Sequence, residues 1–157
     1  MSRGYLYVVN TKTDGSMNES MDVSEDELYY LSGREFDYIE NIPKENSDIL
    51  VNDLINRFAA YGAETGTEEL DEGEFPYVVL TQDVVRKYFA PRLQTLKDMM
   101  RDMTVDDFIE NGYKIKQLVE DPYGDAVYWN GLFHKFDYFM RNIGDVKVYL
   151  GNVLYMK

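Results

Sequence analysis

The segment that decides the fold reads Asp-Ala-Val-Tyr-Trp-Asn-Gly-Leu-Phe-His-Lys-Phe-Asp-Tyr-Phe-Met-Arg-Asn-Ile, from Asp125 to Ile143. Its large apolar side chains recur at helical spacing: Trp129, Leu132, Phe133, Phe136, Phe139, Met140 and Ile143. An apolar face of this width is typical of a helix buried in a core. The spacing therefore predicts a central core helix over residues 125–143, ended by Gly144.

Two further helical regions precede this segment. Thr104 is placed to cap a helix over 105–120, and its apolar positions are expected to face inward: Phe108, Ile109, Ile115, Leu118 and Val119. Thr81 is placed to cap another helix, which Pro91 should break or kink before a second segment continues to about Met103.

The N-terminal half combines strands and helices. Residues 5–10 and 75–80 are rich in aromatic and β-branched residues and are predicted to be strands. Ser24 to Glu27 form a capping box that should begin a short helix. Ser47 should cap a helix that ends at Tyr61, before Gly62. Near the C-terminus, residues 146–156 are predicted to be a hairpin or one bulged strand.

This order of elements predicts an α+β fold with a small, mostly antiparallel sheet of three or four strands, covered by several helices. A chain of 157 residues suits a single globular domain over 1–157. Cysteine is absent, which excludes disulfides and thiolate chemistry and suits a reducing cytoplasm. No apolar run reaches the length of a membrane span, so we expect no membrane association.

The net charge of −13 is confined to one half of the chain. Residues 1–80 hold 18 acids and 5 bases, whereas residues 81–157 hold 11 of each. Because nucleic-acid affinity depends on lysines and arginines that neutralise phosphates, direct binding to DNA or RNA is not expected. A strongly acidic half instead attracts cationic partners.

Residues 63–74 contain six acids and no base, and they are predicted to form an exposed acidic loop, the one candidate hinge of the chain. This loop could also bind calcium, although its spacing matches no known calcium loop.

Catalytic motifs are missing from the sequence. It contains no phosphate-binding glycine loop, no HExxH and no GxSxG, and its one histidine, His134, is expected at the boundary of the core. Asp125 together with Asp145 and Lys147 gives a weak likeness to the carboxylate-and-lysine set of metal-dependent nucleases. We therefore predict no catalytic residues, no metal ligands and no cofactor, and lean against an enzyme.

Acids and tyrosines alternate through the acidic half, and tyrosine is favoured at protein interfaces. The candidate partner-binding residues are Glu25, Asp26, Glu27, Tyr29, Tyr30, Glu35, Asp37, Tyr38, Glu68, Glu69, Asp71 and Glu72. Carboxylates at such density could present a nucleic-acid-like potential to a basic groove. The alternative interpretation is an acidic face that serves solubility alone.

The sequence thus predicts a non-catalytic acidic interaction protein that occludes a basic, nucleic-acid-handling protein, as an inhibitor or an immunity-type or anti-defence accessory protein does. Small acidic chains of this composition are common among phage and mobile-element accessory proteins. Two alternatives stay open: a nuclease-like enzyme dependent on carboxylates and a divalent metal, and a small-ligand module that uses the helix 125–143 as a pocket wall. The oligomeric state is not predicted.

Overall fold

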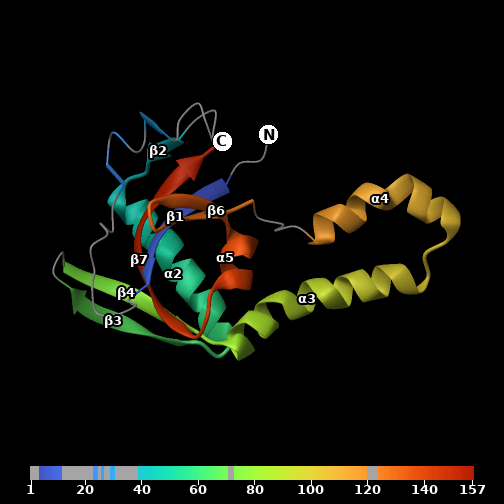
Figure 1. The fold of residues 1–157 in the computed structure, drawn as a ribbon, viewed down its shortest axis with the longest axis horizontal. Coiled ribbons are helices and arrows are strands. Elements are labelled where there is room, and N and C mark those ends of the chain that lie inside the picture. The colour runs from blue at the N-terminus through green and yellow to red at the C-terminus, as the bar shows by residue number, and fades with distance from the viewer. Residues whose placement is uncertain are drawn as a thin grey trace.

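Strand β7, Val146–Met156, lies at the centre of the sheet (Figure 1). The computed structural model describes residues 4–11, 23–24, 26, 29–30, 39–70, 73–119 and 124–157. Along one side, β7 pairs antiparallel with β1, Gly4–Thr11. Along the other side, β4 (Gly73–Leu80) and the short β2 (Ile39–Asn41) pair antiparallel with successive parts of β7. The C-terminal strand therefore joins the two halves of the sheet.

The remaining strands form the two edges. Strand β3, Glu64–Leu70, pairs antiparallel with β4 at one edge. Strand β5, Ala126–Trp129, runs parallel to β1 and pairs with β6, Leu132–Lys135, at the other edge. The described residues thus form a seven-stranded mixed sheet. The structure is α+β, but the prediction of a small, mostly antiparallel sheet of three or four strands is wrong.

Helices cover one face of this sheet. Helix α2 (Lys44–Ala60) and the short α5 (Phe136–Asn142) pack on it, whereas α3 (Gln82–Arg101) and α4 (Val105–Val119) form a hairpin that projects from the body (Figure 1). Over the described stretches of chain, no helix is both long and apolar enough to cross a membrane.

Strand β1 is buried on both of its faces. Tyr7 and Val9 belong to the core under α2 and α5, whereas Leu6 and Val8 face a second cluster that includes Val23 and other apolar residues. Because both faces are covered, the strand reads as a nearly continuous apolar run.

The predicted helix over 125–143 is wrong in its first half. Residues 126–135 form the β5–β6 hairpin, and only 136–142 are helical. Asn130 and Gly131 both adopt positive φ, 55° and 71°, which is the backbone of a two-residue type I′ turn. Trp129 and Leu132 are therefore partners across a hairpin rather than neighbours on a helix.

The acidic segment predicted as a loop over 63–74 is largely strand. Strand β3 pairs along its whole length with β4, whose residues have high strand propensity. Long-range pairing outweighs the low strand propensity of Glu and Gly. Gly66 lies under the Tyr77 ring, where an added Cβ would stand 2.7 Å from the tyrosine hydroxyl oxygen.

Two predictions about helix boundaries also change. Helix α2 begins at Lys44, so Ser47 lies inside it, and the buried Ser47 hydroxyl accepts a hydrogen bond from the Val153 N–H instead of capping the helix. Helix α3 continues through Pro91 without ending. Pro91 is exposed, so water can satisfy the carbonyl that loses its helical donor.

Helix α4 is capped as predicted but is not buried. The Thr104 hydroxyl accepts from the Asp107 N–H and the Asp107 carboxylate accepts from the Thr104 N–H, both at 3.1 Å. The predicted inward-facing residues Phe108 and Ile109 are 60% and 72% exposed, and α4 contains no buried residue. Thr81 likewise caps α3, since its hydroxyl accepts from the Val84 N–H at 3.3 Å.

Some predictions fall on other parts of the chain. The predicted capping box at 24–27 and the short helix that it should begin lie partly outside the described residues, which leave out Glu25 and Glu27.

Candidate functional site

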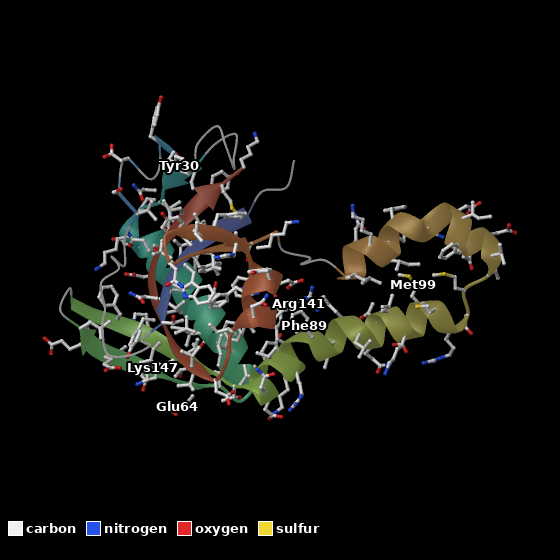
Figure 2. The ribbon with its side chains drawn as sticks, viewed as in Figure 1. Tyr30, Glu64, Phe89, Met99, Arg141 and Lys147 are labelled. Atoms are coloured by element: carbon white, nitrogen blue, oxygen red, sulfur yellow. The ribbon has the colours of Figure 1, made fainter. Side chains whose placement is uncertain are left out.

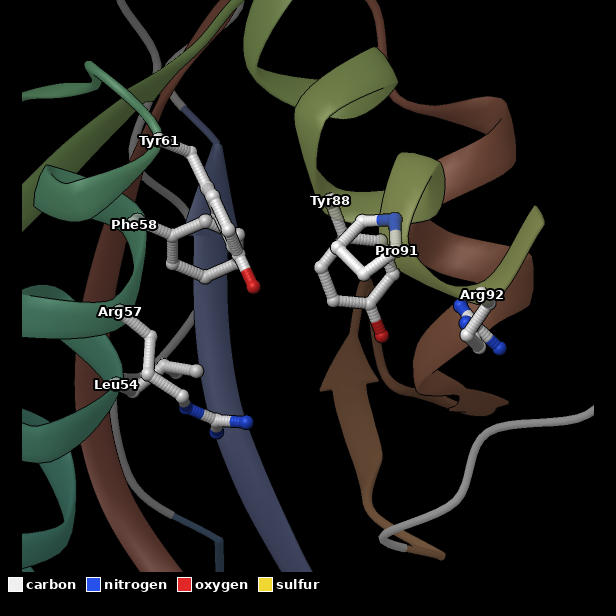
Figure 3. Close-up of a pocket in the computed structure, with 7 residues that line it drawn as sticks. All are labelled: Leu54, Arg57, Phe58, Tyr61, Tyr88, Pro91 and Arg92. Carbon is white, nitrogen blue, oxygen red and sulfur yellow. The ribbon is translucent and has the colours of Figure 1, made fainter. Parts of the chain in front are cut away.

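An open pocket of about 110 Å³ lies between α2 and α3 (Figure 3). Its lining consists of Leu54, Arg57, Phe58 and Tyr61 from α2, and Tyr88, Pro91 and Arg92 from α3. Pockets for drug-sized ligands are about 300 to 1,000 Å³. This pocket is smaller than that range.

Aromatic stacking fixes the floor of this pocket. The Phe58 ring lies 6.3 Å, centroid to centroid, from both Tyr88 of α3 and Phe136 of α5, and it is nearly parallel to Phe136. Phe58 is buried and follows Val51 and Leu54 along the apolar stripe of α2. One side chain therefore joins three helices.

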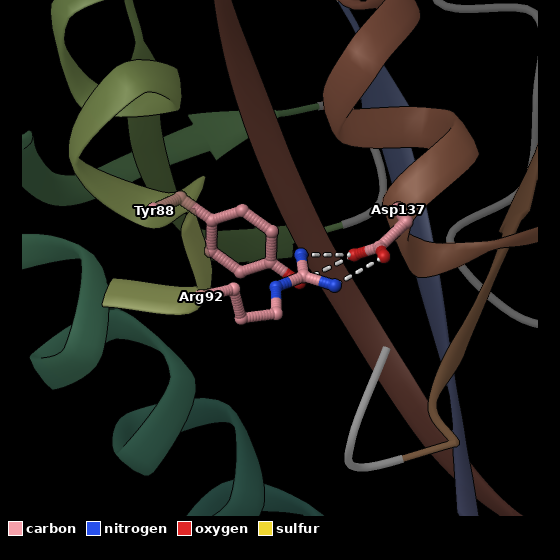
Figure 4. A network of polar contacts seen from close by, with 3 residues as sticks. All are labelled: Tyr88, Arg92 and Asp137. Carbon is pink, nitrogen blue, oxygen red and sulfur yellow. Dashed lines mark hydrogen bonds and ion pairs between the residues drawn. The ribbon is translucent and has the colours of Figure 1, made fainter. Parts of the chain in front are cut away.

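A partly buried polar network lies beside the aromatic floor (Figure 4). Arg92 makes a two-pronged ion pair with Asp137 of α5, with Nη2 donating to Oδ1 at 2.7 Å, and the Tyr88 hydroxyl donates to the same oxygen at 3.0 Å. The guanidinium carbon also lies 4.8 Å from the centroid of the Phe89 ring. Asp137 is 9% exposed, so its charge is stabilised almost entirely by Arg92 and Tyr88.

The network does not form an anion site. Arg92 is already neutralised by Asp137, and Arg57 interacts with the Tyr7 hydroxyl of β1. Burial raises the pKa of Tyr7 to about 12, with the nearby Asp125 carboxylate adding to the effect. Tyr7 is therefore a neutral hydrogen-bonding group at pH 7. We interpret this region as the joint that attaches α3 to the body.

The residues of the nuclease-like alternative have structural roles in different places. The Asp125 carboxylate accepts from the Tyr5 N–H, and the Asp145 carboxylate accepts from the Gln82 N–H at the start of α3, both at 3.0 Å. Lys147 instead pairs with Glu68 at 3.2 Å. Within the described residues, no three histidine, aspartate or glutamate side chains gather as metal ligands would.

His134 lies on the edge strand β6, where it is partly exposed. Its ring stacks on Tyr138 of α5, with centroids 5.2 Å apart and planes 10° apart. The pocket wall predicted from a 125–143 helix does not exist in that form, because the described pocket is lined by α2 and α3.

The predicted partner-binding residues divide into two groups. Asp26, Tyr29 and Tyr30 are exposed, Tyr29 by 86%, and Glu69 is exposed on β3. The others except Glu68 lie outside the described residues: Glu25, Glu27, Glu35, Asp37, Tyr38, Asp71 and Glu72.

Glu68 differs from the other predicted partner-binding acids because it is already engaged. It accepts hydrogen bonds from Lys147 and from the Tyr149 hydroxyl of β7. Glu68 thereby ties the acidic edge strand to the central strand across β4.

Burial also raises the pKa of Tyr149 to about 12, and the hydrogen bond to Glu68 adds to the effect. Tyr7 and Tyr149 therefore stay protonated in the folded protein at a pH where the unfolded chain ionises them, near 10. Their contribution to stability is fully present below pH 10 and is lost as the pH rises through about 12.

We expect the free energy of unfolding to fall between pH 10 and 12, by up to roughly 2 to 3 kcal/mol for each of Tyr7 and Tyr149. Urea unfolding measured at intervals from pH 8 to 12 gives this profile. Tyr149→Phe should flatten the decrease, since one of the two shifted groups is then absent. An identical profile in wild type and Tyr149→Phe would contradict the assignment.

Further acids that carry no ion-pair partner within the described chain lie on α2 and on the β3–β4 ribbon: Glu45, Asp48, Asp53, Glu64, Glu69 and Glu74. All six are exposed.

Comparison with protein-family models, with curated proteins and with solved structures gives no match for this chain.

Proposed function

We propose that this chain is a non-catalytic interaction protein that binds a basic protein partner through its acidic half, in the cytoplasm. The observation that carries the proposal is that Glu69 of β3 lies directly opposite Glu74 of β4. Like charges in directly opposite positions of a sheet destabilise it. A lysine or arginine of a partner placed against this pair would convert the repulsion into attraction.

The surroundings of the pair strengthen the negative potential. Residues 69–74 contain four acids and no base, and β3 is an edge strand of the sheet. Edge position makes this ribbon end accessible to a large partner. A basic groove that normally receives nucleic acid would be attracted to it over long range, and its occlusion would inhibit the partner.

Acids on an edge strand also have a simpler explanation, because charge protects sheet edges from pairing with other chains. The two explanations differ in a measurable way. If the Glu69–Glu74 pair binds a partner, neutralising the pair both stabilises the fold and weakens partner binding. If it serves only protection of the edge, neutralisation changes no binding.

The test uses Glu69→Gln/Glu74→Gln, with Glu45→Gln/Asp53→Asn on α2 as a control that removes the same charge. We expect the ribbon variant to melt about 1 to 3 °C higher, since it loses a repulsion worth roughly 0.2 to 1 kcal/mol. We also expect it to capture several-fold less of a basic partner from lysate of the source cells, whereas the α2 control captures as much as wild type.

Capture should also depend on salt, because the Debye length falls to a few ångströms at roughly 0.5 M salt. A partner released at that concentration supports the proposal. Capture that is insensitive to salt, or equal for wild type and the ribbon variant, argues against it.

A further inference from the structure

Helices α3 and α4, residues 82–119, form a helical arm that leaves the body and folds back on itself (Figure 1). Only its root joins the core: Val84 is buried, and Val85, Tyr88 and Phe89 pack against the core cluster. Beyond the root, α4 packs against α3, and Met99 lies between the two helices (Figure 2). The outer part of the arm has no buried residue.

Large apolar side chains are concentrated on this arm. Seven of the twelve exposed large hydrophobic residues in the described chain belong to it: Leu93, Met100, Val105, Phe108, Ile109, Tyr113 and Val119. Single exposed apolar residues need no explanation, but a concentration of them indicates an interaction surface.

The helical hairpin also needs support. Helix α4 is kinked at Asn111, where φ is −116° and ψ is 19°, so each of its two helical parts is shorter than the roughly 12 to 15 residues below which an isolated helix is marginal in water. Within the arm, α3 covers only one side of α4, and the exposed side contains Phe108 and Ile109. A second packed surface would supply the missing burial.

The charges of the arm indicate which molecule supplies this second packed surface. Its tip, residues 97–110, holds five acids and two bases, a net of −3. Its root, residues 82–96 and 111–119, holds one acid and five bases, a net of +4. Asp137 neutralises Arg92 and so lowers the net positive charge of the root. The two ends of the arm are therefore complementary to each other.

We propose that the arm binds the arm of a second copy of this chain in antiparallel orientation, tip against root, and forms a four-helix bundle. Two helical hairpins packed by their apolar faces make this common bundle architecture. A two-fold axis places each acidic tip beside a basic root, and the same contact occurs twice.

The antiparallel orientation also separates the two bodies. Outside the arm, the chain holds 23 acids and 9 bases, a net of −14. A helix of 20 residues spans about 30 Å, so the bodies lie at opposite ends of the bundle, several Debye lengths of about 8 Å apart at physiological salt. A parallel bundle would bring the two acidic bodies together. This inference is independent of the proposed partner binding, which uses the β3–β4 ribbon.

Sedimentation velocity of the full chain tests the proposal. Protein concentrations from about 1 to 300 µM cover a span of roughly 3 kcal/mol in association free energy. We expect a dimer that Phe108→Glu/Ile109→Glu converts to a monomer across the whole range. Ile49→Glu is the matched control, because Ile49 is 58% exposed on α2, away from the arm. It should remain dimeric. A wild-type monomer at every concentration overturns the proposal.

Charge reversal tests the orientation without touching the apolar residues. Asp102→Lys/Glu110→Lys reverses the tip, and Arg86→Glu/Lys114→Glu reverses the root. We expect each variant alone to dimerise at least about tenfold more weakly, and an equimolar mixture to form heterodimers, in which both tip–root contacts again join opposite charges. Full dimerisation of each single variant, or absence of heterodimers in the mixture, overturns the antiparallel arrangement.

Discussion

Replacing Asp137 with alanine is expected to lower the free energy of unfolding by about 3 to 5 kcal/mol. The substitution leaves the Arg92 guanidinium, whose side chain is only 15% exposed, without its carboxylate, and the Tyr88 hydroxyl loses its acceptor. A mostly buried cation that loses its carboxylate costs far more free energy than the ion pair contributes. Urea unfolding followed by circular dichroism measures the change.

The matched control for this prediction is Asp98→Ala. Asp98 forms an ion pair with Arg101 on the exposed surface of the same helix that contains Arg92. Its removal should cost at most about 0.5 kcal/mol, since exposed pairs contribute little. The double variant Asp137→Ala/Arg92→Ala should be less destabilised than the sum of the two single variants. Equal losses in Asp137→Ala and Asp98→Ala would contradict the role of the joint.

The second large effect is expected for Phe58→Ala, which should also cost about 3 to 5 kcal/mol. Phe58 is 3% exposed and contacts Tyr61, Tyr88 and Phe136, so its loss removes ring contacts with α3 and α5 together with the contact to Tyr61. The space beside the existing pocket cannot collapse easily, because the surrounding rings are held by their own helices.

Ile49→Ala on the same helix α2 is the control for this second variant, because Ile49 is 58% exposed. It should change stability by less than about 0.5 kcal/mol. Phe58→Leu should lose less than Phe58→Ala because it fills part of the cavity. A Phe58→Ala variant as stable as Ile49→Ala would show that the three helices do not depend on this ring.

Local signals in the sequence predicted local structure well. The hydroxyls of Thr81 and Thr104 cap their helices as their sequence contexts predict, and β1 and β4 contain the two strands expected from aromatic and β-branched residues. The segment 125–143 failed because two signals compete there. Its apolar spacing fits a helix, but Asn130-Gly131 is a strong hairpin signal, and the positive φ angles show that the turn prevails.

Long-range structure was less predictable. The acidic composition of residues 64–70 gives no indication of a strand, which exists because β4 pairs with it. The joint of Tyr88, Arg92 and Asp137 brings together residues separated by 45 and 49 positions, and no spacing in the sequence indicates it. The sequence did contain the apolar stripe of α4, and the error was to assume that this stripe faces the core.

The position of β7 determines when this protein can fold during synthesis. In the described sheet, β4 and β1 touch only through β7, and β1 begins at Gly4 whereas β7 ends at Met156. A ribosome must therefore deliver almost the whole of this segment before the two halves of the sheet can join. Until then β1 is an apolar strand without its main partner, and such strands aggregate.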